Sequence, residues 1–236
     1  MELVKIIMLS FVLGALSNQM GGLISFIGNN NKVSISKTSS FTAGITTAII
    51  CFELLFEAFD MANKYSVVIF TVIGIGFVKV LDKIINRLNS DKKDNSAGVI
   101  VSAMAAHNIT EGIAIGAGFK VSLAFGLSLL CAIMLHNIPE GMIIGTMLNK
   151  EKKGIKSMLR ICTLIGLFLA VGAMIGAILG NIEDRYIMPN LALSAGAMLY
   201  VLSYELIPGM HSNYNYKQNG FMYIIGFLLG SLICNL

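Results

Sequence analysis

Charged residues are scarce in this sequence. Asp, Glu, Lys and Arg together make up 13% of the 236 residues, whereas 56% are hydrophobic, and the mean hydropathy is +0.77. A soluble domain of this composition would aggregate, because water would meet too much apolar surface. The scarcity of charge therefore excludes an ordinary soluble domain and indicates a protein that resides in the lipid bilayer.

Paired cysteines are also missing. The chain has four cysteines, and none is spaced with another as in a disulfide framework or a CxxC metal site. The zinc-protease pattern HExxH is absent as well. A metal site, if the chain has one, must therefore be built from residues other than cysteine pairs.

Eight apolar segments are long enough to cross a bilayer, for which about 20 residues suffice. They comprise residues 3–27, 41–62, 65–86, 98–119, 121–148, 159–182, 186–210 and 219–236. In the third segment Lys79, Asp82 and Lys83 shorten the apolar run, so this helix is expected to be kinked or partly interfacial. The first segment lacks a basic n-region and a cleavage site, and we expect it to be retained as a span. No linker divides the chain, so residues 1–236 are predicted to form one all-α, polytopic membrane domain.

Basic residues are distributed unevenly among the loops. Most of the 17 Lys and Arg residues follow odd-numbered segments, and the exceptions are Lys5, Lys64, Lys120 and Arg185. Cytoplasmic loops of membrane proteins accumulate basic residues. We therefore predict that both termini are extracytoplasmic, and we attribute the net charge of +4 to topology and not to nucleic-acid binding.

An internal repeat relates the second and seventh segments at an offset of 152 residues. Ala43-Gly44 corresponds to Ala195-Gly196, and residues 52–55 (Phe-Glu-Leu-Leu) correspond to residues 204–207 (Tyr-Glu-Leu-Ile). In the predicted topology these two segments run in opposite directions. Eight transmembrane helices in a 3+2+3 inverted-repeat arrangement are therefore predicted, a pattern typical of transporters that bind substrate near the bilayer midplane.

Two similar polar hexapeptides lie in the fourth and fifth segments. Residues 107–112 read His-Asn-Ile-Thr-Glu-Gly, and residues 136–141 read His-Asn-Ile-Pro-Glu-Gly, 29 positions later. An ionised Glu at the centre of a membrane helix costs roughly 2.5–3.5 kcal/mol on insertion scales, so a repeated Glu needs a compensating partner. A bound metal cation is the partner that we predict.

The spacing of these hexapeptides suits a metal centre. His and Glu at positions i and i+4 share one face of a helix. Two antiparallel helices would bring together His107, Glu111, His136 and Glu140, a ligand set that suits zinc or a similar divalent metal. Asn108 and Asn137 lie beside them as sources of neutral oxygen atoms. Both hexapeptides fall near the middle of their segments, in agreement with a midplane site.

Three further polar residues are candidates for a transport pathway. Glu53 and Glu205 are isolated carboxylates in apolar segments, and His211 follows Glu205 near the end of its segment. Each Glu could instead only hydrogen-bond a neighbouring helix. We favour a path, because intramembrane ionisable residues are usually functional.

Three functions remain open at this stage. A carrier would expose the metal alternately to each side of the membrane. A membrane-embedded zinc hydrolase would use the metal to activate water, but such enzymes usually have three protein ligands and an open coordination position, whereas four strong ligands are present here. A metal sensor would bind the ion without net flux.

The two hexapeptides resemble the signatures of ZIP (Zrt/Irt-like) divalent-metal transporters, particularly the compact bacterial ZupT/GufA-like group. The resemblance implies zinc, and also Fe²⁺, Mn²⁺, Co²⁺ or Cd²⁺, as substrates imported into the cytoplasm across the inner membrane by a homodimer. It further implies that Glu205 lies near the cytoplasmic exit. The chain departs from the family pattern at Thr110, where many relatives have Pro, and in residues 161–182, which contain no acidic side chain. The second departure argues against a strong two-metal site.

Overall fold

The computed structural model describes residues 2–27, 32–89, 96–182, 186–211 and 216–234. Within these ranges the regular structure is entirely helical. The elements are α1 (Leu3–Ile27), α2 (Lys32–Ala48), η1 (Ile49–Leu55), α3 (Phe56–Met61), α4 (Lys64–Asn89), α5 (Ser96–Val121), α6 (Leu123–Lys150), α7 (Ile155–Ile182), α8 (Ile187–Val201), η3 (Leu202–Leu206), α9 (Ile207–Met210) and α10 (Tyr216–Ile233). Because α2 to α3 and α8 to α9 are each continuous, the described residues form eight long helical stretches.

The helix that contains the second apolar segment starts well before that segment. It begins at Lys32 and not at residue 41, and hydroxyl side chains in this first part bond to the helix backbone. Ser40 Oγ donates to the Ser36 carbonyl oxygen at 2.8 Å, and Thr42 Oγ1 donates to the Thr38 carbonyl oxygen at 2.9 Å. Such bonds satisfy the hydroxyl groups of this polar stretch within the helix.

Six of the described helical stretches are long and apolar enough to cross a membrane. These candidate spans are Leu3–Phe26, Ser36–Met61, Lys64–Leu81, Leu123–Asn149, Ile155–Gly180 and Ile187–Met210. Helix α5 contains His107, Asn108, Glu111 and Lys120, and α10 starts with polar residues, which lowers the hydropathy of both. The structure is therefore that of a multi-pass helical membrane protein.

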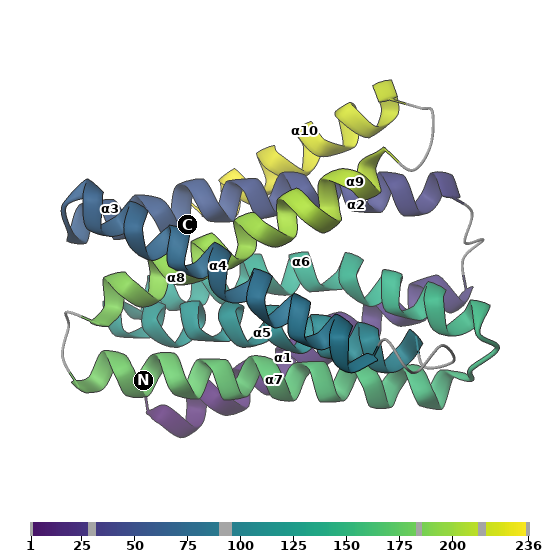
Figure 1. Ribbon diagram of the computed structural model, residues 1–236, viewed down its shortest axis with the longest axis horizontal. Coiled ribbons are helices and arrows are strands. Elements are labelled where there is room, and N and C mark those ends of the chain that lie inside the picture. Colours follow the sequence, from purple (N-terminus) through teal and green to yellow (C-terminus); the bar gives the residue numbers. More distant parts are fainter. Residues whose placement is uncertain (1, 28–31, 90–95, 183–185, 212–215, 235–236) are drawn as a thin grey trace.

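Helices α5 and α6 lie in the middle of the molecule (Figure 1). Helix α5 packs against α7, and α6 packs against α1, while α2 pairs with α10 and α4 pairs with α8. A single residue, Ser122, separates α5 from α6, and its hydroxyl group accepts a hydrogen bond from the Phe125 amide at 3.0 Å. This N-cap lets the chain reverse tightly, so the two helices that carry the hexapeptides form a hairpin.

Two π-helical segments interrupt the repeated helices at equivalent places. Segment η1 contains Glu53, and segment η3 contains Glu205. π-Helical turns are rare and are found mostly at functional sites. The repeat that is visible in the sequence therefore extends to an unusual backbone geometry around both glutamates.

Candidate metal centre

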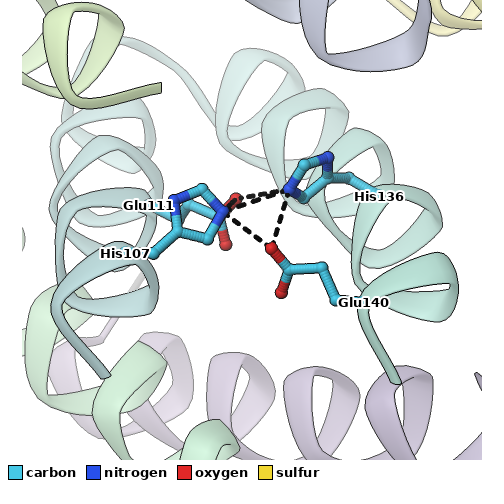
Figure 2. A group of neighbouring side chains, drawn as sticks. All are labelled: His107, Glu111, His136 and Glu140. Atoms are coloured by element: carbon cyan, nitrogen blue, oxygen red, sulfur yellow. Dashed lines mark hydrogen bonds and ion pairs between the residues drawn. The ribbon is translucent and has the colours of Figure 1, made fainter. Parts of the chain in front are cut away.

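Four side chains from the hexapeptides converge between α5 and α6 (Figure 2). His107 and Glu111 project from α5, and His136 and Glu140 project from α6. One potential ligand atom from each of the four lies within 4.8 Å of the others. The i, i+4 spacing on two antiparallel helices thus produces the cluster that the sequence predicts.

The distances within this His/Glu cluster are short. His107 Nε2 lies 3.1 Å from Glu111 Oε1 and 2.8 Å from Glu140 Oε1. His136 Nε2 lies 3.2 Å from the same two oxygen atoms. Tetrahedral zinc has ligands at roughly 2.0–2.2 Å, which places those ligands roughly 3.3–3.6 Å from one another. The four atoms therefore lie close enough together for one small divalent cation to bind all of them.

The cluster is buried and lacks a basic counter-charge. Glu111 is fully buried, and Glu140 is 3% exposed. Among the described residues, both carboxylates have only the two imidazoles as ion-pair partners. Removing two carboxylates from water is expensive unless opposite charge accompanies them. A divalent cation would neutralise both charges at once.

Close helix packing positions the two helices that carry the cluster. A methyl group on Gly112 would lie 2.1 Å from the Leu169 carbonyl oxygen of α7, and one on Gly141 would lie 2.0 Å from the Asn18 carbonyl oxygen of α1. Only glycine allows backbones to approach this closely. Each hexapeptide thus ends in a glycine that fixes its helix against a neighbour.

The two asparagines next to the histidines are fully buried. Asn108 Nδ2 donates to the Met104 carbonyl oxygen at 2.9 Å, but Asn108 Oδ1 has no hydrogen-bond partner among the described residues. Both polar atoms of Asn137 are also without a partner there. Buried polar atoms are normally hydrogen-bonded, so these amides are available to a ligand or to water.

One contact to the cluster comes from a residue that the sequence did not single out. Thr46 of α2 has its Oγ1 atom 2.7 Å from His136 Nδ1, and it is fully buried. Ser and Thr recur throughout α2, so no local pattern distinguishes this threonine. Only the packing of α2 against α6 identifies it.

Of the three candidate pathway residues, Glu53 and His211 are not part of the cluster. Glu53 is 2% exposed, and its Oε1 atom accepts a hydrogen bond from Ser128 of α6. His211 is exposed at the end of α9, where its Nδ1 atom lies 2.9 Å from the Ile207 carbonyl oxygen. The backbone of Glu205 belongs to η3, while its side chain lies outside the part of the structure that is described.

Comparison with known proteins gives consistent matches. Residues 89–235 match the family model described as "ZIP Zinc transporter", a range that includes both hexapeptides. The chain is 36% identical over 120 residues to the zinc transporter GufA of Myxococcus xanthus. The aligned region covers 50% of this chain and 47% of GufA. It is 30% identical over 120 residues to the zinc transporter ZIPB of Bordetella bronchiseptica, and this aligned region covers 50% of this chain and 39% of ZIPB.

A similar match is found to a mammalian protein. The chain is 27% identical over 139 residues to the mouse zinc transporter ZIP10, and the aligned region covers 58% of this chain and 17% of ZIP10. The matched parts of this chain thus span less than half the length of each of these three relatives.

Proposed function

Since this chain belongs to the ZIP family of zinc transporters, we propose that it carries divalent transition metals, zinc above all, across the membrane into the cytoplasm. The observation that carries the proposal is the buried pair Glu111 and Glu140, which two imidazoles face and which no Lys or Arg among the described residues neutralises. A bound M²⁺ supplies the missing charge. The family and the matched relatives are zinc transporters and not enzymes, so the hydrolase alternative is set aside.

The metal ligands in this proposal are His107, Glu111, His136 and Glu140, with Asn108 and Asn137 as neutral oxygen donors beside them. Two imidazoles favour zinc and related metals, namely Fe²⁺, Mn²⁺, Co²⁺ and Cd²⁺, over Mg²⁺ and Ca²⁺, which prefer shells made only of oxygen. Two carboxylates match the charge of one M²⁺. Selectivity then arises from both ligand type and charge.

The proposed carrier crosses the membrane eight times in a 3+2+3 inverted repeat, with both termini extracytoplasmic. Matched helix contacts support this arrangement. A methyl group on Gly44 would lie 2.1 Å from the Tyr223 carbonyl oxygen of α10, and one on Gly196 would lie 2.0 Å from the Thr71 carbonyl oxygen of α4. These two glycines are equivalent in the sequence repeat. The pair α2 and α10 is thus the counterpart of the pair α8 and α4, as an inverted repeat requires.

Helix α5 is one of the two additional crossings in this proposal. Its 26 residues extend about 39 Å at 1.5 Å per residue, which exceeds the roughly 30 Å hydrocarbon core. His107, Asn108 and Glu111 lower its hydropathy, but they are buried within the protein and do not face lipid. Helix α10 is the other additional crossing, and its exposed apolar residues, among them Phe221, Ile224 and Leu228, are suited to contact lipid tails.

Transport in this proposal occurs by alternating access to the site between α5 and α6. Glu53 in η1 and Glu205 in η3 lie in the two halves of the repeat and serve the two halves of the pathway, and His211 stands at the cytoplasmic end. The burial of Glu53 and the π-helical backbone at both glutamates support a functional role. As in the family resemblance, we place the carrier in the inner membrane as a homodimer.

Zinc flux into proteoliposomes tests the function. The purified protein is reconstituted, a zinc indicator is trapped inside, and entry of zinc is compared with that into protein-free vesicles. Saturable entry supports the carrier. Zinc binding by the reconstituted protein without any entry would support a metal sensor and reject the carrier.

A further inference from the structure

Thr46 takes part in two hydrogen-bond contacts at once. Its Oγ1 atom donates to the Thr42 carbonyl oxygen within α2 at 2.9 Å, and the same atom lies 2.7 Å from Nδ1 of His136 on α6. Both threonines and the imidazole are at most 1% exposed. The three groups therefore form a buried series of hydrogen bonds that leads from the backbone of one helix to the proposed metal ligand of another.

The number of available hydrogen atoms decides which groups donate and which accept in this hydrogen-bond series. A threonine hydroxyl group has one hydrogen atom, and a neutral imidazole has one N–H group. If the Thr46 hydrogen is donated to the Thr42 carbonyl oxygen, Oγ1 can only accept from His136, which requires a proton on Nδ1. The other ring nitrogen, Nε2, then carries the free electron pair, and Nε2 is the atom that faces Glu111, Glu140 and His107.

We propose that Thr46 is a positioning residue that holds His136 in the Nδ1–H tautomer and thereby presents Nε2 to the metal. The inference rests on the proposed metal-binding function and extends it to a residue outside the two hexapeptides. Metal-ligating histidines commonly donate their second N–H group to a protein acceptor, which fixes both tautomer and ring orientation. Thr46 supplies this acceptor from a third helix.

The two histidines differ in this respect. His107 Nδ1 is buried without a hydrogen-bond partner among the described residues, whereas His136 Nδ1 has Thr46. His136 is consequently the ligand with the fixed ring, and His107 is the one that adjusts. Removal of the Thr46 hydroxyl group should make the two histidines alike.

Without this hydroxyl group, we expect neutral His136 to favour the tautomer with its proton on Nε2. Nε2 lies 3.2 Å from both Glu111 Oε1 and Glu140 Oε1, so an Nε2–H group would donate to a carboxylate. That tautomer must be lost before a metal can bind. We therefore expect Thr46→Val, which keeps the shape of the side chain, to weaken zinc binding about 10- to 100-fold.

The test combines a tautomer measurement with a binding measurement. Nitrogen-15 NMR of the metal-free protein at pH 8 reports which ring nitrogen of each neutral histidine carries the proton. The chain has only three histidines, and the signal that is lost in His136→Gln identifies His136. We expect Nδ1–H in the wild type and in Thr46→Ser, and Nε2–H in Thr46→Val. Zinc affinity should follow the same order.

Thr47→Val is the matched control. Thr47 is the next residue of α2, and it donates to the Ala43 carbonyl oxygen and accepts from the Tyr223 hydroxyl group, away from the cluster. Its variant should keep the wild-type tautomer and affinity. A proton on Nε2 in wild-type His136, or equal tautomer and affinity in wild type and Thr46→Val, would overturn the role of Thr46 while the metal centre stands. Failure of the wild type to bind any zinc would instead overturn the proposed function, and the NMR signal of the metal-free protein would still decide whether Thr46 fixes the tautomer of His136.

Discussion

The Nε2 atoms of His107 and His136 lie 3.1 Å apart, although the two residues are on different helices. Two neutral imidazoles are stabilised by at most one hydrogen bond at this contact, since only one of the two nitrogen atoms can donate to the other. The same two atoms also face Glu111 and Glu140. Convergence of two donors and two carboxylates on one buried point is explained best by a cation that binds all four.

Zinc binding should weaken at acidic pH. Binding requires ionised carboxylates and neutral imidazoles, so protons compete with the metal. Histidine ordinarily titrates near pH 6.5. We expect the apparent zinc affinity to fall about tenfold or more between pH 7.5 and pH 5.5, which titration calorimetry of the purified protein can measure.

The third histidine provides the control for this pH dependence. His211 is exposed and lies outside the cluster, so His211→Ala should bind zinc with the wild-type affinity and the wild-type pH dependence. An affinity that is constant or rises from pH 7.5 to pH 5.5 would be incompatible with the proposed ligand set.

Added methyl groups at the hexapeptide glycines should destabilise the protein. In Gly112→Ala and Gly141→Ala the new methyl group would meet the backbone of α7 or α1 at about 2 Å. Because backbone cannot move aside as a flexible side chain can, we expect each variant to lose about 1–3 kcal/mol of stability. Thermal unfolding of the purified protein in detergent measures the change.

Gly76→Ala is the matched control for these two variants. Gly76 is in the middle of α4, and no atom lies within 4 Å of the position that its Cβ would occupy. Alanine has the higher helix propensity, so this variant should unfold at or above the wild-type temperature. If all three variants unfolded at the same temperature, close packing would not explain the glycines of the hexapeptides.

Substitution at Glu53 should separate transport from binding. Glu53→Gln keeps the size of the side chain and its ability to contact Ser128, but it replaces the ionisable carboxyl group with a neutral amide. Since Glu53 is not part of the cluster, we expect maximal zinc flux to fall severalfold while the equilibrium affinity stays at the wild-type value.

Glu57→Gln, on the continuation of the same helix, is the comparison for Glu53 and should leave the flux nearly unchanged. Glu57 is only half-buried and makes no ion pair with Lys or Arg in the described part of the chain. Loss of zinc affinity in Glu53→Gln would show that Glu53 belongs to the binding site and not to a separate part of the pathway.

The cluster could be predicted from the sequence because its geometry is local. Helical periodicity places His107 beside Glu111 and His136 beside Glu140, and the hairpin between them leaves few ways to pair the helices. The ZIP resemblance, which rests on the same residues, is confirmed by the family match.

Contacts between distant helices could not be predicted in this way. The approach of Thr46 to His136 depends on how α2 packs against α6, and the approach of Ser128 to Glu53 depends on how η1 packs against α6. Nothing in the local sequences specifies that packing. The π-helical turns at Glu53 and Glu205 were not predicted either, since neither segment contains a Gly or Pro that would mark an irregular turn. The first turns of α2 are polar, so a search for apolar segments does not include them.

The central claim is that the His/Glu cluster is the transported-metal site, and zinc flux in proteoliposomes tests it most directly. Wild type, His107→Ala and Glu140→Ala are compared at pH 7.5, with Thr47→Val as a reconstitution control. We predict saturable zinc entry in the wild type and the control, and flux at the level of protein-free vesicles in the two cluster variants. Wild-type flux in either cluster variant would contradict the claim.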